Sequence, residues 1–384
     1  MFGLVVPQAQ AAFTSLYIFG DGVSTTTTNG QTYPYTTNYY GLRRSNGRVW
    51  VELLAQQLNL TNNYWYSNNP ANHLSYTNLS ASSTNWSYSS NNWSYYYDAS
   101  TNTSMGLVAN VSAFNAPTNA SNALFIVWVN DADFVDYMGS IYPSYGTNIT
   151  QWTNAINRSL TNEWLAVTNL YYAKGVRTLI MPNAVDITEI PEYDLISSAN
   201  KSFIRQMITN FNTAFTPMLS NAMVSCPGLI IYEPDFFSLL DNILANPTAY
   251  GVTNALSGGQ SVDALEDPSL VNKSPNGPGT NYIFWDATDP TAKVHAIMAD
   301  LVEQLIAPVQ FGQITSSNGT NQLNLANVPV GLNGIVQGST NLALTNWTAV
   351  TNFPSTNDTL SVFVPTSGPA QFYRLSFPYS WTWP

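Results

Sequence analysis

Residues 15–26 read SLYIFGDGVSTT, and this stretch decides the fold expected for the chain. The apolar run predicts a buried strand, and the Gly-Asp-Gly sequence at 20–22 predicts a tight turn directly after it. In α/β sheets, ligands bind beside the carboxyl ends of the strands. We therefore expect the turn at Asp21 and Gly22 to lie at the functional site.

Buried strands and amphipathic helices alternate along the chain that follows. Apolar runs predict strands over 123–129, 176–181 and 229–232, and helical periodicity predicts helices over 49–58, 153–172, 197–219 and 235–245. An alternation of this length implies a parallel sheet with helices on both faces. The sequence thus predicts an α/β domain over residues 13–306.

The pattern changes after Pro308. Short alternating runs stand at 332–337, 347–353, 360–364 and 372–377, separated by clusters of Asn, Gly, Ser, Thr and Pro. This spacing predicts a small antiparallel β module. The runs around 337–348 and 372–375 also resemble β-sandwich modules at the C-termini of secreted bacterial proteins. We expect residues 307–384 to form such a module.

The polar part of the composition is unusual. Only 9% of the 384 residues are charged, and Asn, Ser and Thr fill the place that Lys and Glu usually take. Such a surface favours an extracellular, cell-surface or assembled protein. The net charge of −11 excludes a basic stripe for nucleic acid.

Cysteine, histidine and hydropathy exclude further classes of protein. The single Cys226 allows no disulfide within the chain, and no Cys or His cluster offers a zinc site. No window reaches the roughly 18 apolar residues of a membrane-spanning helix. Residues 1–12 read either as the tail of a secretory signal or as a retained N-terminal arm. About fourteen candidate glycosylation sequons occur, including those that begin at Asn59, Asn78, Asn85, Asn92, Asn110, Asn148 and Asn346.

Three segments resemble the SGNH hydrolase superfamily, which contains the GDSL lipases and esterases. They are FGDG at 19–22, the RRSNGRVWVELL segment at 43–54 and the NPTAYGVTN segment at 246–254. The resemblance implies a flavodoxin-like three-layer α/β fold with a parallel sheet. The segment at 43–54 is the most specific of the three, and in the family it is a structural helix that packs on the sheet.

The resemblance also assigns the catalytic positions, and this chain departs from nearly all of them. The family uses a nucleophilic serine, an oxyanion glycine and asparagine, and an aspartate three residues before a histidine base. The corresponding residues here are Gly22, Asn130, Ala132, Asp286 and Asp289. Only Asp286 keeps its residue type, and an aspartate with an ordinary pKa near 4 is a poor base at neutral pH.

Few residues offer themselves as replacements. The family has a further glycine in its second sequence motif, and the corresponding position here falls near Tyr97 or Asp98. Ser24, with Thr25 beside it, is the fallback nucleophile, although a serine after a strand more often caps a turn. The histidines, His73 and His295, are expected to be exposed or structural.

The expected function is that of a catalytically inactive secreted or cell-surface protein that self-associates into an extracellular assembly or filament. The arm, the C-terminal module and an aromatic segment at 64–97 are the candidate intersubunit contacts. One alternative is an esterase for carbohydrate or lipid esters with a relocated nucleophile. Another is a glycan-binding module that uses the former substrate cleft. The rings at 64–97 equally suit stacking on sugar rings and burial against one another. No cofactor is expected.

The substituted site predicts an acidic pocket. Its acids are expected to be Asp21, Asp286 and Asp289, with Asp133 and Asp98 near the rim. Acids this close repel, so one is protonated, paired with Arg43 or Arg44, or bridged by a cation. Calcium suits oxygen ligands best, although acids that are kept apart by water or that cap helices are the more ordinary arrangement.

Overall fold

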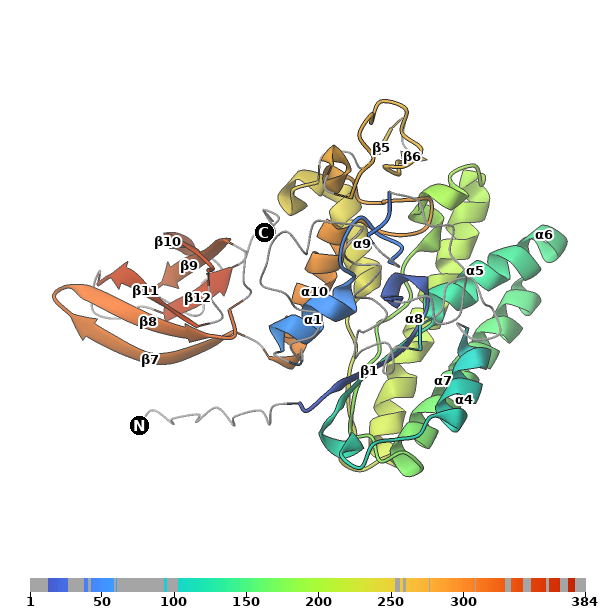
Figure 1. The fold of residues 1–384 in the computed structure, drawn as a ribbon, viewed down its shortest axis with the longest axis horizontal. Helices are drawn as coiled ribbons and strands as arrows, with labels where there is room; N and C mark the ends of the chain where they lie inside the picture. The colour runs from blue at the N-terminus through green and yellow to red at the C-terminus, as the bar shows by residue number, and fades with distance from the viewer. Residues whose placement is uncertain are drawn as a thin grey trace.

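The computed structural model describes residues 13–26, 38–40, 43–58, 60, 93–94, 103–252, 256–257, 260–275, 277–307, 309–328, 333–340, 347–356, 359–366 and 372–376. In this part of the chain an α/β body comes first, and antiparallel sheets follow it on one side (Figure 1).

A parallel sheet forms the centre of the α/β body. Its described strands are β1 (Leu16–Gly20), β2 (Leu124–Trp128), β3 (Thr178–Ile180) and β4 (Ile230–Tyr232), in the order β1-β2-β3-β4. All their pairings are parallel, with Leu16 opposite Leu124 and Gly20 opposite Trp128. Every residue of β2 is buried, as expected for an inner strand covered on both faces.

Residues 93–94 lie against the outer edge of β1. The Trp93 amide donates a hydrogen bond of 2.7 Å to the Ile18 carbonyl oxygen. A Cβ at Gly20 would lie 2.8 Å from Ser94 Oγ, so glycine allows this close approach. This edge is where a flavodoxin-like sheet carries its second strand.

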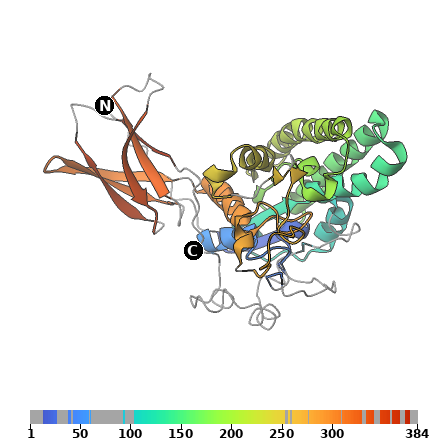
Figure 2. The same cartoon turned by 90° about the horizontal axis from the view of Figure 1, so that it is seen from above.

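Helices cover both faces of the sheet (Figures 1 and 2). One face carries α1 (Trp50–Gln57), α9 (Phe236–Ala245) and α10 (Ala292–Ile306), and the other carries α4 (Ser104–Ala113), α7 (Ile149–Tyr172) and α8 (Ser198–Ser225). Helix α1 packs on α10, and α7 packs on both α4 and α8. The three-layer α/β fold predicted from the sequence is confirmed.

Three aromatic rings join the sheet to the α1 and α9 side. Trp50 of α1, Trp128 of β2 and Phe236 of α9 meet edge to face, with ring centroids 5.0 to 5.8 Å apart. All three side chains are almost fully buried. Such contacts add about 0.5–1.5 kcal/mol per pair beyond the buried area.

The segment before α1 is held by buried polar contacts. Arg43 donates two hydrogen bonds to Glu52, whose carboxylate also accepts the Val49 amide at 3.0 Å. The helix predicted over 49–58 is α1, which begins at Trp50. Asn46 Oδ1 accepts the Ala292 amide at 2.8 Å, at the start of α10. The segment is therefore structural, as predicted, but its asparagine caps the other helix.

The C-terminal strands form two antiparallel sheets. Their strands are β7 (Gln310–Ser317), β8 (Thr320–Ala326), β9 (Asn333–Ser339), β10 (Thr348–Pro354), β11 (Leu360–Pro365) and β12 (Phe372–Ser376). The sheet orders are β11-β8-β7 and β10-β9-β12. A separate apolar cluster that includes Leu323, Val336 and Phe353 lies in this region. The predicted all-β C-terminal part is confirmed, and its boundary at 307 stays a prediction.

Some elements were not predicted. Strands β7 and β8 form a hairpin whose turn residues, Asn318 and Gly319, both have positive φ, 50° and 76°. Asn-Gly is the preferred pair for such a type I′ turn and was the available signal. The sequence reading also missed α4, α5 (Asn130–Ser140) and the short hairpin of β5 (Leu256–Ser257) and β6 (Gln260–Ser261).

Candidate functional site

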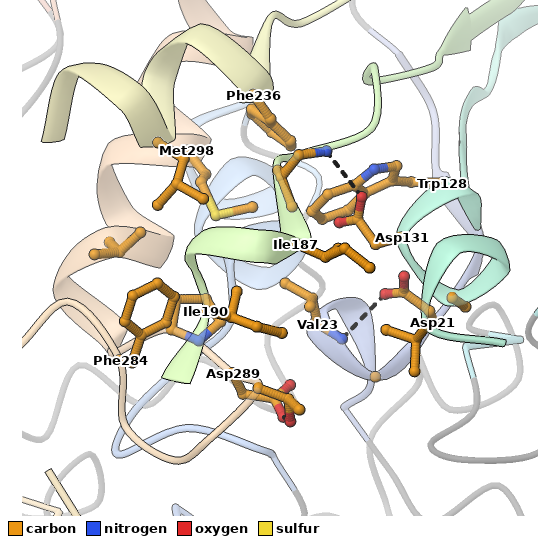
Figure 3. Close-up of a pocket in the computed structure, with 18 of the residues that line it drawn as sticks. Asp21, Val23, Trp128, Asp131, Ile187, Ile190, Phe236, Phe284, Asp289 and Met298 are labelled. Atoms are coloured by element: carbon orange, nitrogen blue, oxygen red, sulfur yellow. Dashed lines mark hydrogen bonds between the residues drawn. The ribbon is translucent and has the colours of Figure 1, made fainter. Parts of the chain in front are cut away.

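A cavity of about 440 Å³ lies at the carboxyl end of the sheet (Figure 3). Trp128 closes it at the end of β2, and Phe236 and Met298 line it from α9 and α10. Ile187 and Ile190 line it from the segment after β3, which contains the 3₁₀ helix η4 (Ile187–Glu189). Most of the wall is therefore apolar. This edge of the sheet is where the sequence predicted the site.

The turn after β1 forms the 3₁₀ helix η1 (Gly22–Ser24) at one side of the cavity. Asp21 caps it, because its carboxylate accepts the Val23 amide at 3.1 Å. Gly22 lines the cavity, so a residue without a side chain stands where the resemblance places the nucleophile.

Ser24 is turned away from the cavity. It is fully buried, its hydroxyl accepts a hydrogen bond from Trp50 Nε1 at 3.1 Å, and it is absent from the cavity wall. Thr25 donates its hydroxyl to the Asp21 carbonyl oxygen at 3.0 Å. These positions suit packing and turn formation, and they do not suit a nucleophile.

The first turn of α5 presents the residues that the resemblance assigns to the oxyanion donors. Asn130 is buried and donates its amide to the Pro182 carbonyl oxygen at 2.9 Å. Ala132 lines the cavity and offers no side-chain donor. Asp133 accepts hydrogen bonds from the Ser104 amide at 3.0 Å and from Ser159 Oγ at 2.5 Å. Burial raises the pKa of Asp133 to about 6. Asn130 and Asp133 thus tie α5 to its neighbours.

Asp131 joins Asp21 in the cavity, and the sequence reading missed it. The two carboxyl groups lie on the same side of the cavity (Figure 3). Burial raises the pKa of Asp21 to about 7, while its amide hydrogen bonds lower it and the charge of Asp133 adds a smaller increase. Burial, with the charge of Asp21, raises the pKa of Asp131 well above its usual range. The available signal was an acid in the first residues after a buried strand.

Arg44 lies between Asp286 and Asp289, the two acids at the positions of the family's aspartate and histidine. Its Nη2 lies 3.2 Å from Asp286 Oδ2 and its Nε lies 3.1 Å from Asp289 Oδ2. Asp286 closes a turn by accepting the Thr288 and Asp289 amides, and it accepts the Tyr39 hydroxyl at 2.7 Å. Asp289 lines the cavity, whereas Asp286 does not.

The environment of Asp289 corrects one step of the sequence reading. Burial raises its pKa to about 7, with a further increase from Asp286 and a decrease from Arg44. The sequence predicted an ordinary pKa near 4 for Asp289 and therefore a poor base at neutral pH. The raised pKa removes this argument against Asp289 as a base. Its Oδ2 atom, however, already accepts hydrogen bonds from Arg44 and the Thr288 hydroxyl.

The predicted acidic pocket exists in altered form. Asp21 and Asp289 line one cavity, Asp131 joins them, and neither Asp286 nor Asp133 is part of its wall. Arg44 supplies the counter-charge between Asp286 and Asp289, at the place where a cation was considered. Among the described residues, no group of three or more His, Cys, Asp or Glu is arranged to hold a metal ion. The calcium hypothesis therefore has no support in the geometry.

The remaining candidates lie in the core or beyond the described part of the chain. His295 is fully buried, its Nδ1 accepts the Trp50 amide at 3.2 Å, and burial lowers its pKa to about 3. It is a neutral structural residue. Trp93 stacks on Phe19 at 5.1 Å, so this ring of the aromatic segment packs on the sheet. His73, Tyr97, Asp98, the arm at 1–12 and the other rings of 64–97 lie outside the described residues.

Comparisons with known proteins agree with this geometry. The family model described as GDSL-like Lipase/Acylhydrolase matches residues 16–302, which include every residue of the cavity wall. Two Arabidopsis thaliana proteins, each named a GDSL esterase/lipase, are similar to the chain. One is 22% identical over 328 residues, which cover 76% of this chain and 89% of the relative. The other is 23% identical over 336 residues, which cover 79% and 86%.

Proposed function

Because this chain belongs to the GDSL-like lipase/acylhydrolase family, we propose that it is a non-hydrolytic member in which the cavity persists without the nucleophile. Gly22 in the cavity wall is the observation that carries this proposal. A glycine cannot form an acyl-enzyme, and the nearby Ser24 hydroxyl is buried against Trp50. The relatives are named esterases and lipases, so the proposal separates this chain from them.

Labelling with a fluorophosphonate tests the proposal. An activated serine attacks the phosphorus of this reagent and displaces fluoride, which leaves a stable phosphonyl adduct. We expect the intact mass of the native chain to stay unchanged while a serine hydrolase treated in parallel gains the adduct. An adduct on Ser24 that is absent from Ser24→Ala would contradict the proposal and favour a relocated nucleophile.

A second candidate function follows from the raised pKa of Asp289. A carboxyl group with a pKa of about 7 matches the requirement for a general base at neutral pH, and Asp289 lines the cavity. In this alternative the chain is an esterase. Asp289 takes a proton from water as the water oxygen bonds to the ester carbonyl carbon, and the alkoxide takes that proton when its bond to this carbon breaks. The ion pair with Arg44 opposes this role, because it stabilises the carboxylate and occupies Oδ2. The alternative predicts ester turnover that Asp289→Asn abolishes.

The wider role that we propose is a secreted or cell-surface protein that self-associates. The low charge content supports this, as do Ile314 and Phe363 on the outer strands of sheet β11-β8-β7, which are 48% and 61% exposed. Within the described residues, the helices are too short or too polar to cross a membrane. Glycan binding in the former substrate cleft is the alternative partner proposal.

Sedimentation velocity over a range of concentrations tests the self-association. We expect species larger than the 42.2 kDa chain, and we expect Phe363→Asp to shift the distribution toward that mass. The exposed Leu195, at 95%, lies outside the C-terminal sheets and gives the matched control Leu195→Asp. A single 42.2 kDa species at the highest concentration would contradict this role.

A further inference from the structure

The size and wall of the cavity suit a small apolar molecule. Its volume of about 440 Å³ falls within the roughly 300–1,000 Å³ typical of ligand sites. Apolar side chains reach it from the ends of β1 and β2, from the segment after β3, and from α5, α9 and α10. Burial of an apolar ligand there would remove apolar surface of both partners from water.

The ionisable side chains in the wall are all acids. The charged residues that line the cavity are Asp21, Asp131, Asp136 and Asp289, and no Lys, Arg or His stands among the described residues of its wall. Asp289 is paired with Arg44, whereas Asp21 and Asp131 make no ion pair with a described residue. A carboxylate ligand, such as a fatty acid, would be repelled by this wall, and a cation would be attracted.

One acid oxygen in the wall lacks a partner. Asp131 is 93% buried, since its exposed fraction is 7%, and its Oδ1 accepts the Val185 amide at 3.0 Å. Its Oδ2 receives no hydrogen bond from the described part of the chain. Figure 3 shows the carboxyl groups of Asp131 and Asp21 on the same side of the cavity. A carboxyl oxygen that lines a cavity and has no donor from the chain is open to a ligand that brings one.

We propose that the cavity binds a small apolar molecule that carries an ammonium group, with the ammonium held between Asp21 and Asp131 and the apolar part against Trp128, Ile187 and Phe236. An ammonium group has three N–H donors, enough to reach both carboxyl groups. This inference rests on the proposed function, because a cavity that performs no acyl transfer is left to serve as a binding site.

Binding of this kind depends on pH. The acidic groups that face the ammonium position or line the same wall are Asp21, Asp131, Asp136 and Asp289, and Asp133 lies behind the wall. Arg44 pairs with Asp289. Burial raises the pKa of Asp21 to about 7 and that of Asp131 well above its usual range, so the empty cavity holds at least one proton below pH 7. A bound cation must displace this proton. The affinity for an amine therefore rises as the pH increases through about 7.

Three probes that share one apolar body test the proposal: 4-phenylbutylamine, 4-phenylbutan-1-ol and 5-phenylpentanoate. Isothermal titration calorimetry at pH 8 is expected to show the amine binding at least about tenfold more tightly than the alcohol, with the carboxylate weaker than both. Equal affinities for amine and alcohol, or no binding of the amine, would overturn the proposal.

Asp131→Asn identifies the carboxyl group responsible. The amide oxygen still accepts the Val185 amide, so the change removes the ionisable carboxyl group and keeps the hydrogen bond. We expect the preference for the amine over the alcohol to fall by about tenfold or more. Glu192→Gln removes one charge from an exposed position outside the cavity and is expected to change nothing. Loss of preference in both variants alike would contradict a specific role for Asp131.

A pH series on the unmodified chain gives a readout that needs no variant. Amine affinity is expected to increase from pH 5.5 to pH 8, while alcohol affinity stays constant, and an amine affinity independent of pH would contradict the proposal. The probes contain no ester bond. Failure here therefore leaves the absence of hydrolysis untouched, and ester turnover would leave an amine preference untouched.

Discussion

Buried polar groups are paired at the junction of α1 with α10, whereas two buried acids in the cavity beside η1 have no basic partner among the described residues. At the junction, Arg43 pairs with Glu52, Asn46 caps α10 and His295 accepts the first amide of α1. In the cavity, Asp21 and Asp131 lie on the same side with no basic partner among the described residues. Polar groups of the first kind stabilise the fold, whereas those of the second kind destabilise it and are available to a ligand.

Removing charge from the junction should have the largest effect on stability. Glu52→Gln leaves the buried Arg43 guanidinium without its counter-ion, and we expect a loss of about 3–5 kcal/mol in the free energy of unfolding. Urea denaturation measures this. The exposed Glu192→Gln should change stability by less than about 0.5 kcal/mol. A similar small change in Glu52→Gln would show that the junction does not depend on the ion pair.

Replacing an acid in the cavity should instead increase the free energy of unfolding. The pKa of Asp21 is raised from 3.8 to about 7, so its contribution to stability is present below pH 3.8 and is lost as the pH rises through about 7. Asp21→Asn retains a capping side chain and removes this penalty. We expect it to stabilise the chain by about 2 kcal/mol at pH 8 and to change little at pH 3.5. Destabilisation at pH 8 in urea titrations would contradict the comparison.

A smaller effect should separate a buried cap from an exposed one. Asn46→Ala removes the side chain that accepts the Ala292 amide, and we expect a loss of about 1–2 kcal/mol. Asn148 caps α7 at an exposed position by accepting the Thr150 amide, and Asn148→Ala should cost less, about 0.5–1 kcal/mol. Thermal melts of the two variants check the order. A reversed order would show that burial adds nothing to the cap at α10.

The sheet and the long helices were predictable because each has a simple apolar pattern. The run at Leu124–Trp128 is wholly buried, and α7 and α8 carry apolar residues at helical spacing. The first turn of α5 has no such pattern. Its buried residues are Asn130, Asp131 and Asp133. The two acids accept hydrogen bonds from Ser104, Ser159 and Val185, and Asn130 donates one to Pro182, all far away in sequence.

The site, too, could be predicted only where a local sequence pattern marks it. The sequence placed Gly22 and Asp289 at one edge of the sheet, and both line the cavity. It did not show that Ser24 turns toward Trp50, that Arg44 bridges Asp286 and Asp289, or that burial raises the pKa of Asp289 to about 7. These properties come from the packing of segments that lie far apart in the sequence, and no local pattern predicts them. Arg44 and Asp289, for example, are more than 200 residues apart.

Ester hydrolysis by the full chain tests the central proposal most directly. The assay follows p-nitrophenyl acetate and butyrate from pH 5 to pH 9, with the unmodified chain, Ser24→Ala and Asp289→Asn at equal concentrations. We expect all three to match the rate of the unfolded chain at every pH. A saturable rate that rises near pH 7 and disappears in Asp289→Asn, or one that disappears in Ser24→Ala, would show that the cavity is an active site.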